Sequence, residues 1–406
     1  IERATGVPAS AVLFSTTHTH AGPDLQGLWG GVPRSWVRDV LVPGSVRAVQ
    51  AALADLRAVT LEERHGPAPE FNSYRRPRIV DPDADTDAVA TLLDARDAAS
   101  GGVVGSLLQF NAHPTTLREQ VPLPHPDFVL GALDLLELRG GVALYVNGPI
   151  ADASPSGTRA GCAHPADGAY GVARCRGEGI AASVLALPRG RVLAPTLEVR
   201  RASVALPVTN PLFLAAGATG AFNGYYDFLD LPVADIPVVG EAVGAGLVDL
   251  PQLTPVATVD VTRITIGGAM AGLELVTIPG EATGTFGDEI RALAGPRAHV
   301  ALLGLTHASL GYIIPEAEFS YVDASGDIGF LLPYTSYEEL VSIGPLTAPL
   351  LRALAYAPLF DAPSDRALPP VLTSCLADPR SPRCALHVVE RHLEYAGTEL
   401  ARDLVP

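Results

Sequence analysis

The segment Phe14–Asp24 carries two histidines separated by one residue, His18 and His20, directly after a short apolar run. β-Branched and small residues around them are typical of an extended strand. Because residues two apart in a strand share a face, both imidazoles would point into the same space. The Gly22-Pro23 pair then predicts a turn that ends the strand. Two imidazoles begin a zinc site, although two ligands alone do not hold the ion.

Other residues with suitable chemistry follow apolar runs further along the chain. In a buried mixed sheet, functional residues lie in loops just past the carboxyl ends of strands. Five polar loci at five strand ends therefore predict one shared site. Besides the two histidines, the loci are His113 after Val103–Phe110, Asp152 and Ser154 after Val142–Val146, Glu281 after Leu273–Ile278, and Tyr312 after His299–Leu305.

These residue types indicate metal chemistry. Two or three histidines and one glutamate are a zinc set of the hydrolytic type. A zinc ion with an open position polarises a carbonyl and lowers the pKa of bound water to about 7. Tyr312 could add a phenolate ligand or an acidic hydrogen-bond donor. Arg75 could hold an anion or a carbonyl oxygen, and Arg76 and Arg78 are alternatives to it.

The elements that must position these residues alternate between strands and helices. This pattern predicts the α/β class, with a mixed and largely buried sheet flanked by helices and the zinc site at the strand ends. The expected strands are 58–64, 88–93, 103–110, 142–146, 192–206, 255–266, 273–278 and 299–305. The expected helices are 35–57 with a break or kink at Pro43-Gly44, 128–138, 177–187, 285–294, 336–355 and 390–404.

Composition excludes several classes of protein. The 406 residues are 48% hydrophobic and 18% charged, which is typical of a globular protein with a large core. The net charge is −16, no lysine occurs, and no basic run exists, so nucleic acid is not an expected partner. No stretch approaches the ~20 apolar residues of a transmembrane segment.

The four cysteines fall into two local pairs, Cys162/Cys175 and Cys375/Cys384, without the spacing of a zinc ribbon or redox motif. Short even pairs in Gly/Pro-rich sequence favour two disulfides and an exported protein. The alternative is four unrelated buried thiols. Residues 1–11 look like the tail of a helix that runs straight into a strand, so we expect the natural N-terminus to lie upstream.

The motifs resemble, in the same order, those of the neutral/alkaline, non-lysosomal ceramidases and their bacterial relatives. Thr17-His-Thr-His-Ala-Gly-Pro23 is similar to the family's Thr-His-Thr-His-Ser-Gly-Pro, and Phe110-Asn-Ala-His-Pro-Thr115 to its Phe-Ala-x-His-Pro-Thr. The other matching segments are Asn72–Pro77, Asn147–Pro155, Ile278–Glu281, Gly304–Ile313, Tyr337-Glu338 and Gly344–Thr347.

The resemblance implies a role for each matching residue. Zn²⁺ would be held by His18, His113, Glu281 and Tyr312, and His20 would act beside the metal. Ser154 would be the essential serine, in a segment that also carries Asp152, and Arg75 would match the family's arginine. The reaction implied is hydrolysis of the amide bond of an N-acyl sphingoid lipid. A lipid-like substrate also implies peripheral contact with a membrane and a secreted, periplasmic or cell-envelope location in a bacterium.

The chain also departs from the family. Ala151 stands where the family has glycine, and Ser156 where it has asparagine. We expect a catalytic domain over residues 1–360, a Pro-rich linker and helix over 361–406, and no C-terminal β-sandwich domain. The apolar insert 207–254 could line an acyl-chain groove or simply pack. The alternatives are a zinc hydrolase of another N-acyl amide or ester, and a non-catalytic lipid-binding relative.

Each site residue also has a purely structural interpretation. His18 and His20 could be core histidines bonded to backbone, and His113 could cap a turn. Glu281 could be a carboxylate favoured by a helix N-terminus. Asp152 and Ser154 could order a loop, and Tyr312 could be a core aromatic residue. His125 and His307 are near the motifs in sequence but are not expected to be ligands.

Overall fold

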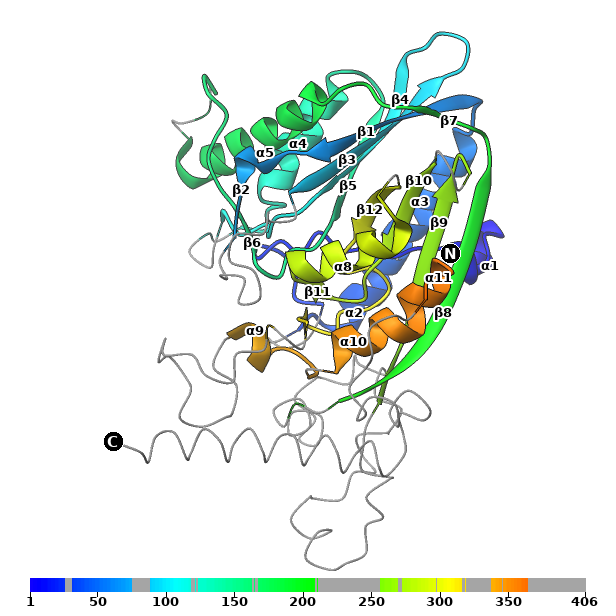
Figure 1. Ribbon diagram of the computed structural model, residues 1–406. Helices are drawn as coiled ribbons and strands as arrows, with labels where there is room; N and C mark the ends of the chain where they lie inside the picture. Colours follow the sequence, from blue (N-terminus) through cyan, green and yellow to red (C-terminus); the bar gives the residue numbers. More distant parts are fainter. Residues whose placement is uncertain are drawn as a thin grey trace, which may run out of the picture.

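The computed structural model (Figure 1) describes residues 1–25, 31–74, 88–117, 121, 123–162, 164, 167–208, 210, 256–268, 272–296, 298–315, 318, 337–344 and 346–363. Two larger sheets and two short strand pairs, flanked by helices, form a mixed α/β architecture. The α/β class predicted from the alternating pattern is therefore confirmed. Helix 390–404 and nearly all of the insert 207–254 lie outside the described residues.

The first sheet has five strands in the order β5-β4-β3-β1-β7. β1, β3 and β4 are antiparallel neighbours, whereas β4 and β5 run parallel. Their bounds are β1 Val59–Pro67, β3 Val89–Asp97, β4 Val103–Phe110, β5 Val142–Asn147 and β7 Val192–Leu193. The parallel pair places the carboxyl ends of β4 and β5 side by side, and His113 follows one of these ends.

Helices α4 (Phe128–Glu137) and α5 (Gly168–Ala186) pack on one face of this sheet around a shared apolar core. Glycines allow the two helices to approach closely. A Cβ added to Gly177 would lie 1.9 Å from the carbonyl oxygen of Phe128, and one added to Gly131 would lie 2.1 Å from that of Arg174. Helix α5 begins nine residues earlier than the helix expected at 177–187.

The second sheet has four strands in the order β12-β10-β9-β8. The strands are β8 Leu197–Pro207, β9 Val256–Ile266, β10 Leu273–Thr277 and β12 His299–Leu303. β10 and β12 are parallel, and the other neighbours are antiparallel. α8 (Gly284–Ala294), α10 (Thr347–Leu351), the π-helical turn η8 (Arg352–Tyr356) and α11 (Ala357–Leu359) cover its outer face around a core that includes Phe286 and Tyr356.

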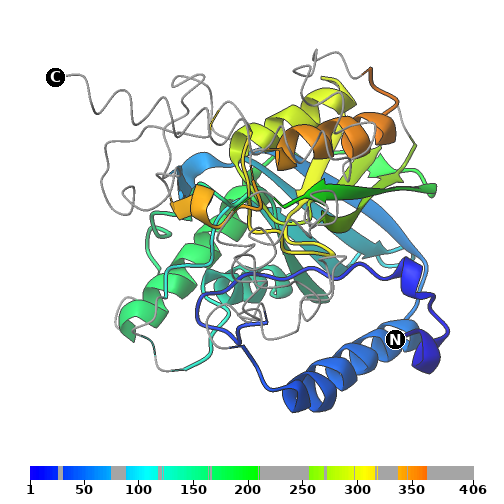
Figure 2. The same ribbon diagram turned by 90° about the horizontal axis from the view of Figure 1, so that it is seen from below.

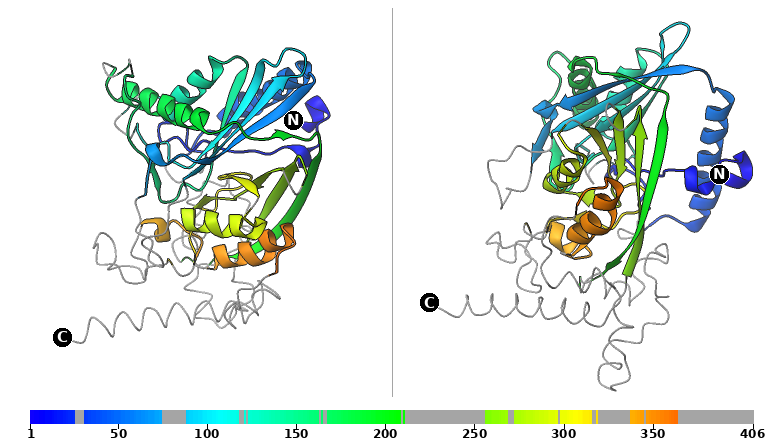
Figure 3. Two further views of the ribbon diagram at one scale, coloured as in Figure 1. Left: turned by 45° about the horizontal axis from the view of Figure 1, so that its top comes forward. Right: turned by 45° about the vertical axis from the view of Figure 1, so that its right-hand side comes forward.

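The two sheets pack against each other, so the molecule has four layers: helices, sheet, sheet, helices (Figure 3). Leu273, Leu275 and Leu303 of the second sheet share a core with Leu61 and Val146 of the first. The carboxyl ends of β5 and β12 meet, since the N–H of Gly304 donates to the carbonyl of Asn147 at 2.8 Å. The strand ends that carry candidate site residues in both sheets therefore face one region.

Several short elements complete the description. They are α1 Glu2–Thr5, η1 Ala9–Ala11, η3 Pro69–Phe71, α9 Tyr337–Leu340 and the strands β2 Asn72–Tyr74, β6 Ala153–Pro155, β11 Glu281–Ala282 and β13 Tyr312–Ile313. β2 pairs with β6, and β11 with β13. Both short pairs contain candidate site residues, because β6 carries Ser154 and β11 carries Glu281.

The first long helix is continuous where a break or kink at Pro43-Gly44 was expected. α2 (Arg34–Trp36), the π-helical turn η2 (Val37–Leu41) and α3 (Val42–Ala54) follow one another, and the combined helix stands to one side of the sheets (Figure 2). Pro43 falls in the first turn of α3, directly after the π-helical turn. Proline lacks the N–H of a regular helical hydrogen bond, and the helix is π-helical directly before it, so the helix is irregular here but the predicted break does not occur.

Helix 336–355 was expected to be continuous, but the structure divides it. α9 ends at Leu340 and α10 begins at Thr347. Gly344 between them has φ 139°, a conformation that a helix does not accommodate. The expected strand 192–206 is likewise split into β7 and β8.

Cys162 and Cys175 form a disulfide with a Cα–Cα distance of 5.6 Å, which confirms the first predicted pair. Cys375 and Cys384 lie outside the described residues. Among the described residues, no helix combines the length and apolar character needed to cross a membrane.

Candidate metal centre

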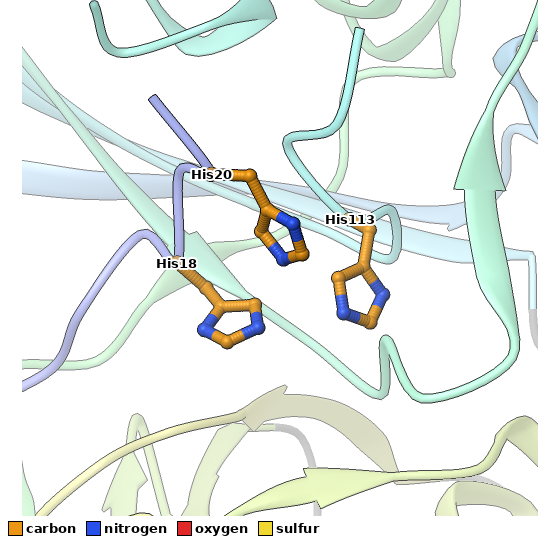
Figure 4. A group of neighbouring side chains, drawn as sticks. All are labelled: His18, His20 and His113. Atoms are coloured by element: carbon orange, nitrogen blue, oxygen red, sulfur yellow. The ribbon is translucent and has the colours of Figure 1, made fainter. Parts of the chain in front are cut away.

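Three histidines converge between the two sheets (Figure 4). His18, His20 and His113 each offer a ring nitrogen, and these nitrogens all lie within 4.8 Å of one another. The ring centroids are 5.1 Å apart for His18–His20 and for His18–His113, and 5.6 Å for His20–His113. His113 is buried, His18 is partly buried and His20 is exposed. The cluster therefore reaches from the interior to the surface.

The two N-terminal histidines do not lie on a strand. Within the segment Phe14–Asp24, only Ser15 makes a β-bridge, an isolated one with Thr306. His18 has the left-handed φ of 61°. The prediction of an extended strand was therefore wrong, and so was the reason given for a shared face. The convergence itself is confirmed, because a turn at His18 brings its ring beside that of His20.

The segment that carries His18 is attached to the ends of strands from both sheets. The N–H of Thr16 donates to the carbonyl of Leu305 at 3.3 Å, just beyond β12. The side-chain amide of Asn147, the last residue of β5, donates to the carbonyl of Thr16 at 3.1 Å. Asn147 is fully buried, so its side chain is held in place by the surrounding core. The segment is thus fixed two residues before His18.

His113 is oriented by the chain that leads to Ser154. Its Nδ1 lies 2.5 Å from the carbonyl oxygen of Ile150. A carbonyl only accepts hydrogen bonds, so Nδ1 carries a proton and Nε2 is the ring nitrogen that is turned toward the cluster. The backbone N–H of His113 also donates to the carbonyl of Ala153 at 3.0 Å. These two bonds fix the ring orientation that a metal ligand requires.

Glu281 directs a buried carboxylate at the same place. Its Oε2 lies 2.9 Å from Nε2 of His113 and 3.4 Å from Nε2 of His18. Burial alone would raise the pKa of the Glu281 carboxyl, but the neighbouring imidazoles outweigh burial and hold this pKa well below its usual value. The carboxylate is therefore the anionic member of the cluster.

Tyr312 is the ladder partner of Glu281. β11 and β13 are parallel, with Glu281 opposite Tyr312. The Tyr312 ring is buried, and its centroid lies 6.4 Å from that of His113 and 5.8 Å from that of Tyr337. The ladder thus brings the tyrosine to the edge of the histidine cluster.

Asp152 and Ser154 adjoin the cluster through backbone contacts. Asp152 Oδ1 accepts a hydrogen bond of 3.0 Å from the N–H of Gly284, at the first turn of α8 and three residues beyond Glu281. Ser154 pairs with Ser73 between β6 and β2, and it directly follows Ala153, the residue that holds the His113 backbone. Arg75, one residue beyond β2, lies outside the described residues.

The donor set fits zinc. Imidazole nitrogens and a carboxylate oxygen are the ligands of hydrolytic zinc sites, and here Nε2 of His113, Nε2 of His18 and Oε2 of Glu281 are directed at one another. The fixed Nδ1 proton of His113 leaves the correct nitrogen for coordination. Among the described residues, His18, His20 and His113 form the one compact group of three or more histidine, cysteine, aspartate or glutamate residues.

Sequence reasoning overlooked two polar residues that support the cluster. Asn147 ends a buried strand, and Asp127 precedes an apolar helical run whose first N–H it caps. An aspartate directly before a helix is a recognisable N-cap signal. The role of Asn147 depends on a long-range contact with Thr16, so no local pattern indicates it.

Comparison with known proteins identifies the fold. No family model and no curated protein matches the chain. Two solved structures are similar to it: the neutral ceramidase from Pseudomonas aeruginosa, with a TM-score of 0.58, and a ceramidase complexed with C2, with a TM-score of 0.60. Each is 20% identical and covers 90% of this chain. The resemblance predicted from the motifs is thus confirmed for the fold.

The two ceramidase chains are longer than the present one. The comparison covers 63% of the Pseudomonas aeruginosa chain and 66% of the other. The chain therefore spans about two thirds of the structures that it resembles.

Proposed function

We propose that this protein is a zinc-dependent hydrolase that cleaves the amide bond of an N-acyl sphingoid lipid, releasing a fatty acid and an amine. The convergence of His18, His113 and Glu281 carries the proposal, because it places a hydrolytic zinc donor set in a fold shared with ceramidases. Zinc bound there would supply a Lewis acid that polarises the acyl carbonyl and activates water.

We assign the metal ligands to His18, His113, Glu281 and Tyr312. The contacts of Glu281 with the first two and its pairing with Tyr312 support this set. His20 is exposed on the solvent side of the cluster, where it can take up or deliver a proton. This assignment predicts that His18→Ala abolishes zinc binding, whereas His20→Ala retains zinc and loses turnover.

Ser154 and Asp152 have separate roles in the proposal. Asp152 acts as a positioning residue, since it anchors the first turn of α8 and hence the segment that follows Glu281. Ser154 either attacks the acyl carbonyl or orients the attacking water, and His20 accepts the proton. Arg75 would donate a hydrogen bond to the developing oxyanion, a role that Tyr312 could take instead only as a neutral phenol that does not ligate the metal. The variant Ser154→Ala should lose turnover with unchanged zinc content.

The decisive experiment combines metal analysis with an assay. The purified protein is stripped of metal, reconstituted with zinc, and tested against fluorescent N-acyl sphingosines, with His18→Ala and Glu281→Ala as variants. We expect one zinc per chain, turnover only after reconstitution, and loss of both in the variants. A wild-type protein without stoichiometric zinc would refute the metal assignment. Zinc binding without turnover of any N-acyl lipid would refute the substrate.

A second candidate keeps the zinc chemistry and changes the substrate to another N-acyl amide or an ester. One observation favours it: Ala151 stands where the family motif has glycine. A panel of amides and esters, assayed with the zinc-loaded protein, separates the two candidates.

The proposed location follows from the disulfide. A bond between Cys162 and Cys175 forms and persists in an oxidising compartment. We therefore propose that the protein is secreted or resides in the periplasm or cell envelope, where a peripheral encounter with membrane lipid would supply the substrate.

A further inference from the structure

Thr19 stands between the two N-terminal histidines of the cluster and makes two hydrogen bonds with one hydroxyl. The hydroxyl donates to the carbonyl of His125 at 2.7 Å and accepts from the N–H of Ala21 at 3.3 Å. The first bond reaches across 106 residues. Thr19 therefore connects the segment with His18 and His20 to the chain that follows His113.

Backbone bonds strengthen the same connection. The N–H of His125 donates to the carbonyl of Ala21 at 2.8 Å, and the N–H of His20 donates to the carbonyl of Pro114 at 3.3 Å. The turn leaves no room beside Thr19, because a Cβ added to Gly22 would lie 2.8 Å from its methyl carbon. Residues 19–21 are thus held against both ends of the stretch from Pro114 to His125.

Asp127 links the beginning of that stretch, at Leu117, to its end, at His125. The residue is fully buried, and its two carboxylate oxygens accept from the N–H groups of Leu117 and Phe128, each at 2.6 Å. Its own N–H donates to Nδ1 of His125 at 2.9 Å. Asp127 adopts φ 60°, an unfavourable conformation for a non-glycine residue that the surrounding bonds must maintain. A continuous path of hydrogen bonds therefore joins the two histidine-bearing segments.

We propose that Thr19 and Asp127 are positioning residues that set the distance between the His18/His20 pair and His113 before any metal binds. The inference rests on the proposed zinc site, which it deepens. The left-handed backbone of His18 is intrinsically unfavourable, so a turn released from His125 would relax toward other conformations. Zinc binding would then have to restore the ordered turn, and affinity would fall.

Substitution of the hydroxyl tests the proposal. Thr19→Val keeps the shape of the side chain and removes both hydrogen bonds, whereas Thr19→Ser keeps the hydroxyl. We expect Thr19→Val to weaken zinc binding by about 10- to 100-fold, the range for residues that orient metal ligands, and Thr19→Ser to stay within about threefold of wild type. Competition with a chromogenic chelator measures the dissociation constants.

Thr91→Val is the matched control. The Thr91 hydroxyl bonds Nδ1 of His65 at 2.9 Å, in a buried cluster on another part of the first sheet, and this variant should leave zinc affinity unchanged. Amide hydrogen exchange of the metal-free protein provides a second readout. Thr19→Val should lower the protection of the His20 and His125 amides, although it removes neither of their hydrogen bonds, and Thr91→Val should not.

The outcomes separate this inference from the proposed function. Unchanged exchange at His20 and His125 in Thr19→Val, or equal loss of zinc affinity in Thr19→Ser and Thr19→Val, would overturn the positioning role. A wild-type protein that binds no zinc, with exchange altered only by Thr19→Val, would overturn the proposed function and leave the ordering of the turn by Thr19 established.

Discussion

The variant Glu281→Gln should leave the metal-free fold intact and abolish most of the stabilisation by zinc. The substitution keeps the size of the side chain and removes the charge that faces His18 and His113 at 3.4 and 2.9 Å. Removing one partner of a buried ion pair normally costs about 3–5 kcal/mol, because the other charge is left uncompensated. Here the remaining partners are imidazoles, which, unlike a guanidinium, can exist as neutral side chains.

The metal-free variant should therefore unfold within about 1 kcal/mol of wild type at pH 8, since it leaves no buried charge behind. A carboxamide can also donate a hydrogen bond to an unprotonated imidazole nitrogen. The stability of Glu281→Gln without zinc thus tests directly whether the two imidazoles leave an uncompensated charge when the carboxylate is removed.

Glu274→Gln is the matched control at a second buried glutamate. The Glu274 carboxylate binds Arg263 through two hydrogen bonds of 2.8 and 2.9 Å and accepts a third from Thr265 at 2.7 Å. The Arg263 guanidinium cannot lose its proton, so a partly buried positive charge remains. We expect this variant to lose about 3 kcal/mol of stability and to bind zinc like wild type.

Zinc should remove most of the difference in stability between the two variants. At a zinc concentration 100 times the dissociation constant, binding stabilises the wild-type fold by about 2.7 kcal/mol. Loss of a ligand should weaken binding at least hundredfold, which leaves about 0.4 kcal/mol at the same zinc concentration. Urea unfolding of the wild type and both variants, with and without zinc, measures these free energies of unfolding. Retained zinc stabilisation in Glu281→Gln, or a loss of several kcal/mol without zinc, would refute the assigned role of Glu281.

Three further predictions concern the fold. Burial and neighbouring positive charges lower the pKa of His65 to about 3. Between pH 6.5 and 3 the unfolded chain therefore binds a proton at His65 that the folded chain does not bind. The free energy of unfolding should fall on acidification through this window by up to about 1.4 kcal/mol per pH unit. The slope should be smaller in His65→Asn, and urea midpoints at several pH values measure it. An unchanged slope in the variant would contradict His65 as the origin. The Cys162–Cys175 disulfide closes a short loop of sequence separation 13. The double variant Cys162→Ser/Cys175→Ser should lose about 3 kcal/mol of stability in unfolding experiments. Undiminished stability would contradict this contribution. Gly177→Ala drives a methyl group into the Phe128 carbonyl and should destabilise by at least about 1–3 kcal/mol in thermal unfolding, whereas a neutral effect would contradict the close helix contact.

The buried strands were predicted well, because a short uninterrupted apolar run buries both of its faces when it forms a strand in a sheet that is covered on both sides. The run Val103–Phe110 became β4 with the predicted bounds, and Leu273–Ile278 became β10 with one residue fewer. Local composition was a poorer guide to helix ends. The conformation of Gly344 interrupts a helix that periodicity alone extends from 336 to 355. The helix around Pro43, in contrast, continues past the proline by way of a π-helical turn, although a break was expected there.

The convergence of His18, His20, His113 and Glu281 was predicted correctly, but one of the reasons was not. Strand-end placement correctly brought His113 and Glu281 together from different sheets. The strand assigned to His18 was wrong, because its conformation is set by contacts with residues about 100 to 300 positions away. Such contacts leave no periodic trace in the local sequence. The motif indicated which residues meet, and the long-range bonds determine how.

The origin of the ligands has a consequence for stability. His113 extends from the end of β4 in the first sheet, Glu281 follows β10 in the second, and the segment of His18 is bonded to Asn147 of the first sheet and Leu305 of the second. No single sheet supplies the donor set. A metal that binds all three residues must therefore bind only when both sheets are packed, and its binding free energy should stabilise the junction of the sheets as well as the site itself.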